Sequence, residues 1–389
     1  MDSIIQNFNN DSKKLLKELF SSKNYEAIIH LYFNVEKSRE YITRYSGLYC
    51  DRYLIETLSL TDYQTIANNA AKTGDLDLVK YCIEKGADNY KDIVINCAKK
   101  GHLNIIEYID NLGLINCYED IASYAAQGGY TKIVQYAVKL GAKNYEIIAE
   151  NAAQYGHFDI VKYALDLGAI NYQDIAVSAI ENGYEEIVKY VLEKLVAKYF
   201  KKVKIVAVGD SKSKKEINIF NGKKLIKSKS FEHCKALFEI YDDLAAMSAY
   251  YGHNELLKYL VELGARNYED ITIRGVKSGR IDIVKYGIEL GAKNYEEIAE
   301  VAASIGKLDI IKYAIELGAR NYEKIALKAA SLFDNYFDIV KYAIELGARN
   351  YEEIAQVAAK FNHIDLVKYL IDLGAKNYIK SYMNNKINV

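Results

Sequence analysis

The chain contains no proline and no tryptophan, and only eight of its 389 residues are arginine, against 43 lysines. Average proline usage is about 5%, so its complete absence from a chain of this length needs an explanation. Proline is excluded from helix interiors because it lacks the backbone N–H and clashes with the preceding turn. A proline-free helical unit that was duplicated many times would account for the absence.

Cysteine is also scarce, and no long apolar segment is present. The five cysteines are odd in number and none forms a CxxC pair, which favours reduced thiols in a reducing compartment. No run approaches the roughly 18 apolar residues of a membrane span, and the first ten residues do not resemble a signal peptide. A net charge of −1 provides no global attraction to nucleic acid or membrane. These absences predict a soluble, cytoplasmic protein.

What the sequence does contain is a unit of about 27 residues, written ten times and shown cleanly by residues 294–320. A glycine closes the second half of nine copies, at intervals of 27 to 29 residues, and Leu195 takes its place before a longer gap. These glycines are Gly86, Gly113, Gly141, Gly168, Gly264, Gly291, Gly318, Gly347 and Gly374. A fixed period in this range predicts a solenoid, in which neighbouring units bury one continuous core.

The first half of each unit predicts a helix with one buried face. Numbered from the asparagine of each unit, small or apolar residues fall at positions 2, 5, 6, 9 and 10, which is the helical spacing. In residues 294–306 these are Tyr295, Ile298, Ala299, Ala302 and Ala303. Asn294 stands where an N-cap is expected, and Glu297 would complete a capping box. Position 13 is glycine in most copies and asparagine at Asn335 and Asn362, the residue types that tolerate a left-handed helix end.

The second half predicts a helix that is apolar nearly all round. Only Asp309, Lys312 and Glu316 are polar in the copy at 294–320, three and four residues apart on one narrow stripe. A charged docking ladder is one interpretation, and a solvated edge with weak ion pairs is the one we favour. The recurring tyrosines at positions 2 and 20 are interpreted as core or inter-repeat stacking residues rather than a ligand cage.

One family resemblance rests on residues 156–169, which read Gly-His-Phe-Asp-Ile-Val-Lys-Tyr-Ala-Leu-Asp-Leu-Gly-Ala after Ala152 and Ala153. This string resembles the second half of an ankyrin repeat, and the resemblance spans residues 62–197 and 240–376. Where ankyrin units open with Thr-Pro-Leu-His, this chain has Glu-Ile-Ala-Glu at 297–300, and its period is about six residues shorter than 33. The missing stretch corresponds to the β-hairpin finger of ankyrin proteins.

The resemblance implies stacked helix pairs without finger-mediated binding. Shortened, proline-free, Tyr/Asn/Lys-rich repeats of this kind resemble those of ankyrin repeat proteins from giant amoeba viruses, which implies the cytoplasm of a host cell. The expected fold class is an all-α, ankyrin-like solenoid of about ten 27-residue helix pairs with a small β-hairpin insert. The expected domains are a helical cap at 1–61, repeats at 62–197, a basic insert at 198–239, repeats at 240–376 and a C-terminal cap or tail at 377–389.

Comparison of the copies separates framework positions from variable ones. The second helix barely changes, whereas positions 3, 4, 7, 8, 11 and 12 of the first helix vary freely. Large apolar residues near positions 11 and 12 are of the type that forms interface hot spots, although neutral drift on a solvated face is the alternative. They are Tyr155, Tyr250, Tyr251, Ile305, Phe333 and Phe361. We therefore expect a monomeric scaffold or adaptor that binds an unidentified protein partner on this face.

The interruption at 198–239 offers the competing hypothesis. Without a glycine at 195, the preceding helix is expected to continue to about residue 202, before a strand at 203–208 and a hairpin around Asn221 and Gly222. The segment contains 12 lysines and four acids, hence a net charge of +8, which would suit nucleic acid or an anionic surface. The lack of arginine weakens the nucleic-acid interpretation. The candidate residues are Lys212, Lys214, Lys215, Lys223 and Lys224.

No enzymatic constellation is apparent. Four of the six histidines occupy the same repeat position, 14, which indicates a structural role: His102, His157, His253 and His363. No HExxH, CxxC or Gly-x-Ser-x-Gly motif occurs. The sequence therefore predicts no catalytic residue, no cofactor and no metal site.

Overall fold

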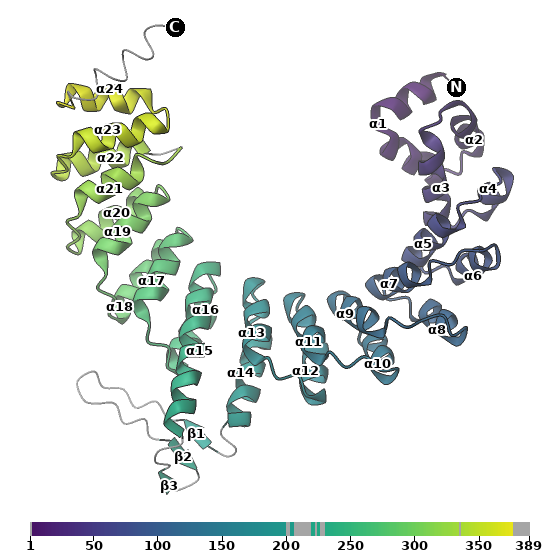
Figure 1. The fold of residues 1–389 in the computed structure, drawn as a ribbon, viewed down its shortest axis with the longest axis horizontal. Helices are drawn as coiled ribbons and strands as arrows, with labels where there is room; N and C mark the ends of the chain where they lie inside the picture. Colours follow the sequence, from purple (N-terminus) through teal and green to yellow (C-terminus); the bar gives the residue numbers. More distant parts are fainter. Residues whose placement is uncertain are drawn as a thin grey trace. The chain divides into compact units, whose positions relative to one another are not determined.

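The computed structural model describes residues 2–199, 203–205, 219–221, 224–225, 230–333 and 336–375. Within these ranges the chain is almost entirely helical, and it divides into two compact units, Met1–Val191 and Leu192–Val389 (Figure 1). No helix in the described ranges is both long enough and apolar enough to cross a membrane. The all-α helical-repeat architecture predicted from the periodicity is confirmed.

The first unit is built from helices that follow one another in pairs. They are α1 (Asp2–Ser21), α2 (Tyr25–Asn34), α3 (Ser38–Leu48), α4 (Arg52–Thr57), α5 (Tyr63–Thr73), α6 (Leu76–Glu84), α7 (Tyr90–Lys100), α8 (Leu103–Asn111), α9 (Tyr118–Gly128), α10 (Thr131–Lys139), α11 (Tyr145–Gln154), α12 (Phe158–Leu167) and α13 (Tyr172–Glu181). Helix α14 (Glu185–Tyr199) runs past the end of this unit into the next.

The second unit continues the same alternation. Its helices are α15 (Ser230–Tyr251), α16 (Asn254–Leu263), α17 (Tyr268–Lys277), α18 (Ile281–Leu290), α19 (Tyr295–Ser304), α20 (Leu308–Glu316), α21 (Tyr322–Ala329), α22 (Tyr336–Leu346), α23 (Tyr351–Lys360) and α24 (Ile364–Asp372). Three short antiparallel strands precede α15: β1 (Val203–Ile205), β2 (Ile219–Asn221) and β3 (Lys224–Leu225). Val203 pairs with Asn221, and Asn221 with Lys224. The turn and most of the predicted hairpin lie outside the described residues, so the β-hairpin insert stays a prediction.

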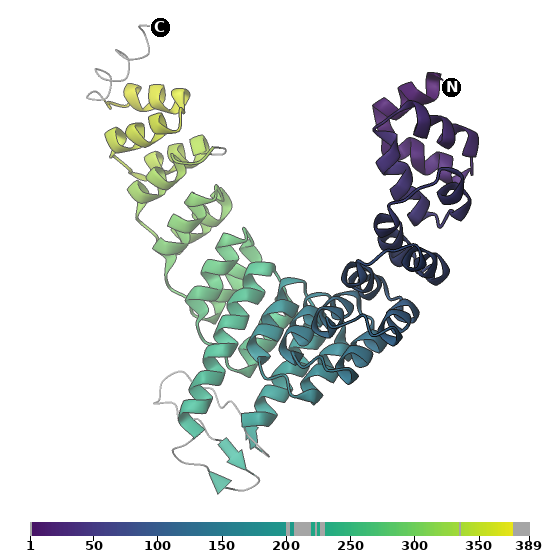
Figure 2. The ribbon, with the colours of Figure 1, turned by 45° about the vertical axis from the view of Figure 1, so that its right-hand side comes forward.

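Each repeat is one helix pair, and the first helices form the main stack within each unit (Figure 2). In the first unit α5, α7, α9, α11 and α13 pack one on the next, and in the second unit α15, α17, α19, α21 and α23 do the same. The core of the stack is lined by isoleucine and alanine: Ile298, Ala299, Ala302 and Ala303 are all fully buried, as the spacing predicts. Tyr295, at position 2, is only partly buried against this core.

Glycine at position 13 has two separate reasons to be there. Gly129 has a φ of +78°, in the left-handed region that favours glycine, and an added Cβ would lie 2.6 Å from His157 Cε1. The ring of His157 is held in place because its Nε2 lies 3.0 Å from the carbonyl oxygen of Gln127. Asn362 also adopts a positive φ, of 62°, which confirms the predicted left-handed end, whereas Asn335 lies outside the described residues.

The predicted capping box at Asn294 is wrong. Asn294 does occupy the N-cap of α19, but its side chain accepts no hydrogen bond from the helix backbone. Its Nδ2 instead donates to Glu297 Oε2 at 2.9 Å, because the amide can act as donor as well as acceptor. In the next repeat, Asn321 Nδ2 donates to Glu300 Oε1 at 2.7 Å and to the Glu296 carbonyl oxygen at 3.0 Å. There the asparagine links one repeat to the repeat before it.

The lysine of the polar stripe also acts between repeats. Asp309, Lys312 and Glu316 are exposed, as expected of a solvated edge. Lys312 Nζ, however, lies 5.4 Å from the ring centroid of Tyr342, the position-20 tyrosine of the following repeat. The same contact occurs between Lys285 and Tyr313, at 5.4 Å. Such cation–π contacts stabilise by about 0.5–1 kcal/mol at exposed sites, so the stripe helps to hold neighbouring repeats together.

The ends of the interrupted region differ partly from the sequence prediction. Helix α14 continues past Leu195 to Tyr199, which confirms that the helix has no stop at the missing glycine; residues 200–202 lie outside the described residues. Helix α15 begins at Ser230, within the segment assigned to the insert, rather than near residue 240. Leu237, Tyr241 and Leu244 are buried at helical spacing, which extends the first helix of the sixth repeat backwards.

The first 61 residues, where a helical cap is expected, contain four helices. Helices α1 and α2 pack as one pair, α3 and α4 as another, and α3 packs on α5 as successive first helices do elsewhere. Ile42 of α3 and Leu54 of α4 are fully buried in this packing. The helix-pair arrangement therefore extends beyond the ten copies that the sequence repeats make visible.

We predict that Gly129→Ala destabilises the protein more than Gly113→Ala. Gly113 has a similar φ, of +69°, but an added Cβ there would meet no atom within 4 Å. In the Gly113→Ala control, the free energy of unfolding should decrease by about 1–2 kcal/mol because of the left-handed backbone alone. In Gly129→Ala it should decrease by about 1–3 kcal/mol more, because the added Cβ crowds the His157 ring. Chemical denaturation of both variants measures the difference, and equal losses would show that the ring moves aside without cost.

Candidate functional site

The six large apolar residues predicted from the variable positions all lie exposed at or just after the ends of first helices. Their exposed fractions run from 36% for Ile305 to 81% for Phe333. Tyr155 follows α11 in the first unit, Tyr250 and Tyr251 end α15, and Phe361 follows α23. These residues occupy the solvent-facing side of the helix ends, and nothing in their surroundings within the described ranges buries them.

Three of them form what we call the apolar edge: Ile305, Phe333 and Phe361, from three successive repeats of the second unit. The rings of Phe333 and Phe361 lie 6.1 Å apart in a T-shaped arrangement. Phe361 in turn stacks on His363, with centroids 6.1 Å apart and an interplanar angle of 14°. Aromatic pairs of this geometry are worth about 0.5–1.5 kcal/mol beyond their buried area, so the two phenylalanines are held next to each other while remaining exposed.

The remaining candidates are separate from this edge. Tyr250 and Tyr251 contact each other at 5.2 Å between ring centroids, and Tyr251 stacks on His253. Ser278 occupies position 12 in the repeat between Tyr251 and Ile305, so the apolar row is interrupted by a polar residue. Tyr155 belongs to the other unit. The sequence thus identified exposed residues, and within the described part of the chain Phe333 and Phe361 are joined by a ring contact across repeats.

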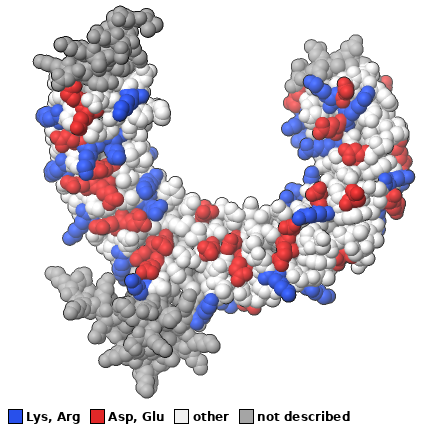
Figure 3. All heavy atoms as spheres, viewed as in Figure 1, with Lys and Arg blue, Asp and Glu red and all other residues white. Residues whose placement is uncertain are grey.

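The opposite ends of the same first helices carry acidic side chains. The first turns of α17, α19, α21 and α23 contain acids at one or both of positions 3 and 4: Glu269, Asp270, Glu296, Glu297, Glu323, Glu352 and Glu353. These side chains are exposed or half-buried, Asp270 is paired with Arg274 at 3.4 Å, and Figure 3 shows acidic and basic side chains interspersed over the repeats of the second unit. The first-helix side of this unit therefore combines an acidic row with the apolar edge.

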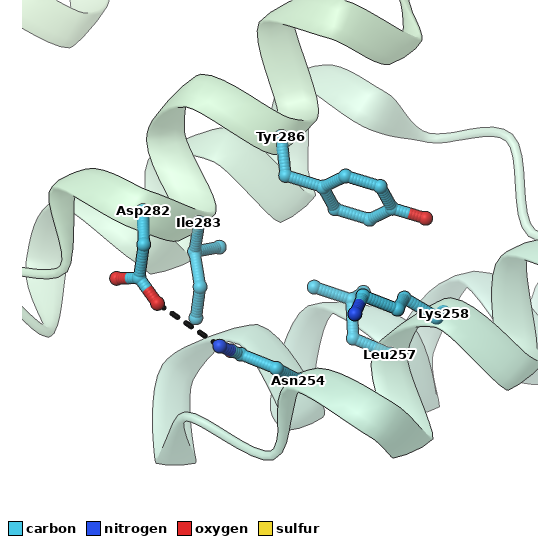
Figure 4. A pocket seen from close by; sticks show the side chains of 6 residues that line it. All are labelled: Asn254, Leu257, Lys258, Asp282, Ile283 and Tyr286. Carbon is cyan, nitrogen blue, oxygen red and sulfur yellow. Dashed lines mark hydrogen bonds between the residues drawn. The ribbon is translucent and has the colours of Figure 1, made fainter.

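A cavity of about 120 Å³ opens between the second helices α16 and α18 (Figure 4). Its lining residues are Asn254, Leu257, Lys258, Asp282, Ile283 and Tyr286. One end is closed by a 3.0 Å hydrogen bond that Asn254 Nδ2 donates to Asp282 Oδ2. That bond and the neighbouring Arg280 guanidinium, 3.4 Å from the same carboxylate, lower the pKa of Asp282. Sequence reasoning missed this cavity, because no single residue signals it.

The recurring histidines act within the framework. His102 Nε2 lies 3.2 Å from the Lys72 carbonyl oxygen, and His157 makes the corresponding contact to Gln127, each reaching the preceding repeat. His253 and His363 stack on Tyr251 and Phe361. In the described part of the chain, no group of three or more His, Cys, Asp or Glu side chains is placed to hold a metal ion.

In the first unit, two tyrosines share the half-buried carboxylate of Asp110. Tyr118 and Tyr136 each donate a 2.7 Å hydrogen bond to Asp110, one to each oxygen. Desolvation and the Asp110 carboxylate raise the pKa of Tyr136, and Asp110 raises that of Tyr118. Both tyrosines come from the repeat that follows Asp110, so this cluster links two repeats and leaves neither oxygen of the carboxylate unsatisfied.

The lysines of the competing hypothesis are not placed by the structure. Lys212, Lys214, Lys215 and Lys223 lie outside the described residues, and Lys224 is described only as part of β3. The electrostatic interpretation of the insert therefore stays a prediction.

Several exposed apolar residues were missed because they lie outside the visible repeats or in their loops. Phe33 of α2 is 64% exposed and Tyr53 of α4 is 56% exposed. Ile170, in the loop before α13, is 60% exposed. The first two belong to a segment whose repeat pattern is too degenerate for copy-to-copy comparison, which was the only signal available for variable positions.

Comparison with known proteins adds no identification. No protein-family model matches the chain, and no curated protein is significantly similar to it.

We predict that Cys82 and Cys97 stay unmodified when the native protein is treated with a thiol reagent at pH 8. Burial raises the pKa of each thiol to about 12 from an ordinary value of 9.0, which lowers the thiolate fraction about a thousandfold. Half-buried Cys50 and Cys117 should react first. Site-by-site mass mapping measures the rates, and similar rates at Cys97 and Cys117 would contradict the packing of the first helices.

The same thiols predict a loss of stability in alkali. In the unfolded chain they ionise near pH 9.0, whereas the folded state keeps them protonated until about pH 12. The stability that they contribute is therefore complete below pH 9 and decreases as the pH rises above it. The measurement is the denaturation midpoint between pH 8 and pH 10, in the unmodified protein and in Cys82→Ser. The midpoint of the unmodified protein should decrease more steeply with pH, because the variant has lost one of the two buried thiols.

Proposed function

We propose that this protein is a non-enzymatic scaffold or adaptor that binds a protein partner on the first-helix side of its second unit. The observation that carries the proposal is the apolar edge, where Phe333 and Phe361 contact each other and yet remain exposed. Burying a phenylalanine side chain yields about 1.5–3 kcal/mol, of which Phe333, 81% exposed, realises little in the free protein and Phe361, 39% exposed, only a part. A partner that covers both rings gains the rest of this free energy.

The chemistry of the surface narrows the kind of partner. The acidic row of α17, α19, α21 and α23 lies on the same first helices as the apolar edge. Because the row and the edge lie at opposite ends of these helices, complementary charge favours a partner that presents basic side chains about one helix length, roughly 15 Å, from its apolar ones. Since fixed side chains on packed helices lose little entropy on binding, a stack of this kind suits docking by shape and charge.

We further propose an ankyrin-like relationship for the repeats. Support comes from three features: each repeat is one helix pair, the first helices pack through alanines, and glycines such as Gly74 and Gly101 end helices in the left-handed conformation. A reducing, cytoplasmic setting, that of a host cell if the chain is viral, fits four thiols that form no disulfide in the described residues. The lysine-rich insert remains the alternative binding element, for nucleic acid or an anionic surface.

We predict that Phe333→Ala and Phe361→Ala each weaken partner binding by about 5–30-fold, which corresponds to about 1–2 kcal/mol. Because the two rings contact each other, the double variant should lose less than the sum of the single losses. The measurement is quantitative capture from a eukaryotic cell lysate, followed by titration of the purified main partner against each variant.

Two controls separate this proposal from its alternative. Phe33→Ala removes a ring of α2 whose exposed fraction, 64%, lies between those of Phe333 and Phe361, and it should leave capture unchanged. A chain in which the five candidate lysines, Lys212, Lys214, Lys215, Lys223 and Lys224, are all replaced by glutamine should keep the same partners. Its binding should weaken little between about 50 and 200 mM salt, whereas binding through the lysines would collapse over that range. Loss of the partners in the glutamine variant, and retention in the Phe333 and Phe361 variants, would assign binding to the insert.

A further inference from the structure

The cavity between α16 and α18 occupies a place that an aromatic ring fills in two of the other nine repeats, the rest having leucine, isoleucine, threonine or glutamate there. Position 15 opens the second helix of each repeat, and it is Asn254 in the sixth. In the fourth repeat the same position is Phe158, whose ring packs on Tyr190 of the next repeat with centroids 5.1 Å apart. In the ninth repeat, after its two extra residues, Phe337 packs on Tyr369 at 5.6 Å. Both pairs are T-shaped.

The sixth repeat retains every part of this arrangement except the ring. In the ninth repeat, Lys341 Nζ lies 4.4 Å from the Phe337 centroid and 5.5 Å from the Tyr369 centroid. The equivalents of Lys341 and Tyr369 are Lys258 and Tyr286, and both line the cavity. Figure 4 shows Tyr286 on one side of the space and Leu257 and Lys258 on the other. A ring placed here would therefore meet a tyrosine and an ammonium group already in position.

The size and walls of the cavity also suit a ring. Its volume of about 120 Å³ is close to that of an engineered 150 Å³ cavity that binds benzene, although that cavity is enclosed and this one is open to solvent on one side. Leu257 and Ile283 are almost completely buried and form an apolar floor. Lys258 is paired with Glu255 at 2.9 Å, but both side chains are more than half exposed, so this pair costs little to rearrange.

We propose that this cavity binds a phenylalanine side chain supplied by a protein partner. The ring takes the place that Phe158 and Phe337 occupy in their own repeats, with its edge or face on Tyr286 and Lys258 beside it. The site lies on second helices, whereas the apolar edge lies at the ends of first helices, so it is a second contact point. This proposal rests on the proposed function in one respect, namely that a protein partner supplies the ring.

The cavity itself is tested with N-acetyl-L-phenylalanine amide as the probe. Methyl NMR of the full chain should show saturable shifts of Leu257 and Ile283, with a dissociation constant of about a millimolar, as expected of so small a ligand. Asn254→Phe places the chain's own ring in the cavity and should weaken probe binding at least tenfold. The matched control is Leu308→Phe, the same position two repeats later, which should leave probe binding unchanged.

Each outcome decides the proposal. Shifts that are absent up to the solubility limit, or that persist in Asn254→Phe, overturn it. If Asn254→Phe does not unfold cooperatively, Asn254→Leu, which is closer in size to asparagine, takes its place as the filled variant. N-acetyl-L-alanine amide serves as the probe control and should shift neither methyl group.

The role of the partner is tested separately. Asn254→Phe should reduce capture of the main partner at least tenfold, and Leu308→Phe should not. Probe binding with unchanged capture would show that the cavity takes a ring but that no captured partner supplies one, which overturns the proposal. Loss of capture in the Phe333 and Phe361 variants is independent of these results, so failure of the proposed function and failure of the cavity are distinguishable.

Discussion

Close packing between successive first helices is the interaction on which the rest of this structure depends. It is possible because the buried positions carry alanine beside isoleucine, as in Ala299, Ala302 and Ala303, so that neighbouring helix backbones approach each other. A single helix pair has no partner for this face and buries it only against the next pair. The constraint explains why the same residues recur at the same positions through both units, and why the degenerate pairs α1–α4 keep buried apolar residues while losing the visible motif.

Around this stack, polar residues link one repeat to the next at its edges. Asn321 reaches Glu300, Lys312 lies over Tyr342, and Tyr118 and Tyr136 converge on Asp110. Each contact is modest, but the asparagine–glutamate and lysine–tyrosine contacts recur along the array, so together these contacts restrain the repeats against sliding or rotating. Positions that take no part in these links are free to vary. Both candidate binding features lie at variable positions. The apolar edge has exposed rings at such positions, and the α16–α18 cavity lies where position 15 is asparagine rather than phenylalanine.

Much of the fold was predictable from local pattern. Buried positions such as Ile298 and Ala302, the left-handed ends at Gly129 and Asn362, and the run of α14 past Leu195 follow from helical periodicity and backbone sterics. The capping box at Asn294 was not, because an asparagine amide has several partners in reach and only the folded geometry selects Glu297. The early start of α15 was missed because its buried residues Leu237, Tyr241 and Leu244 lie outside the repeated motif.

The sequence by itself determined that this chain is a proline-free array of helix pairs, since a 27-residue period and helical spacing are properties of neighbouring residues. It also indicated which side chains are exposed, because residues vary among the copies at positions where packing does not constrain their identity. Which of those side chains meet was decided only by the tertiary structure. Phe333 joins Phe361 rather than Tyr251, and Asn254 leaves a space before Tyr286, because both relations run between repeats, across residues that are neighbours in space and about 30 apart in the chain.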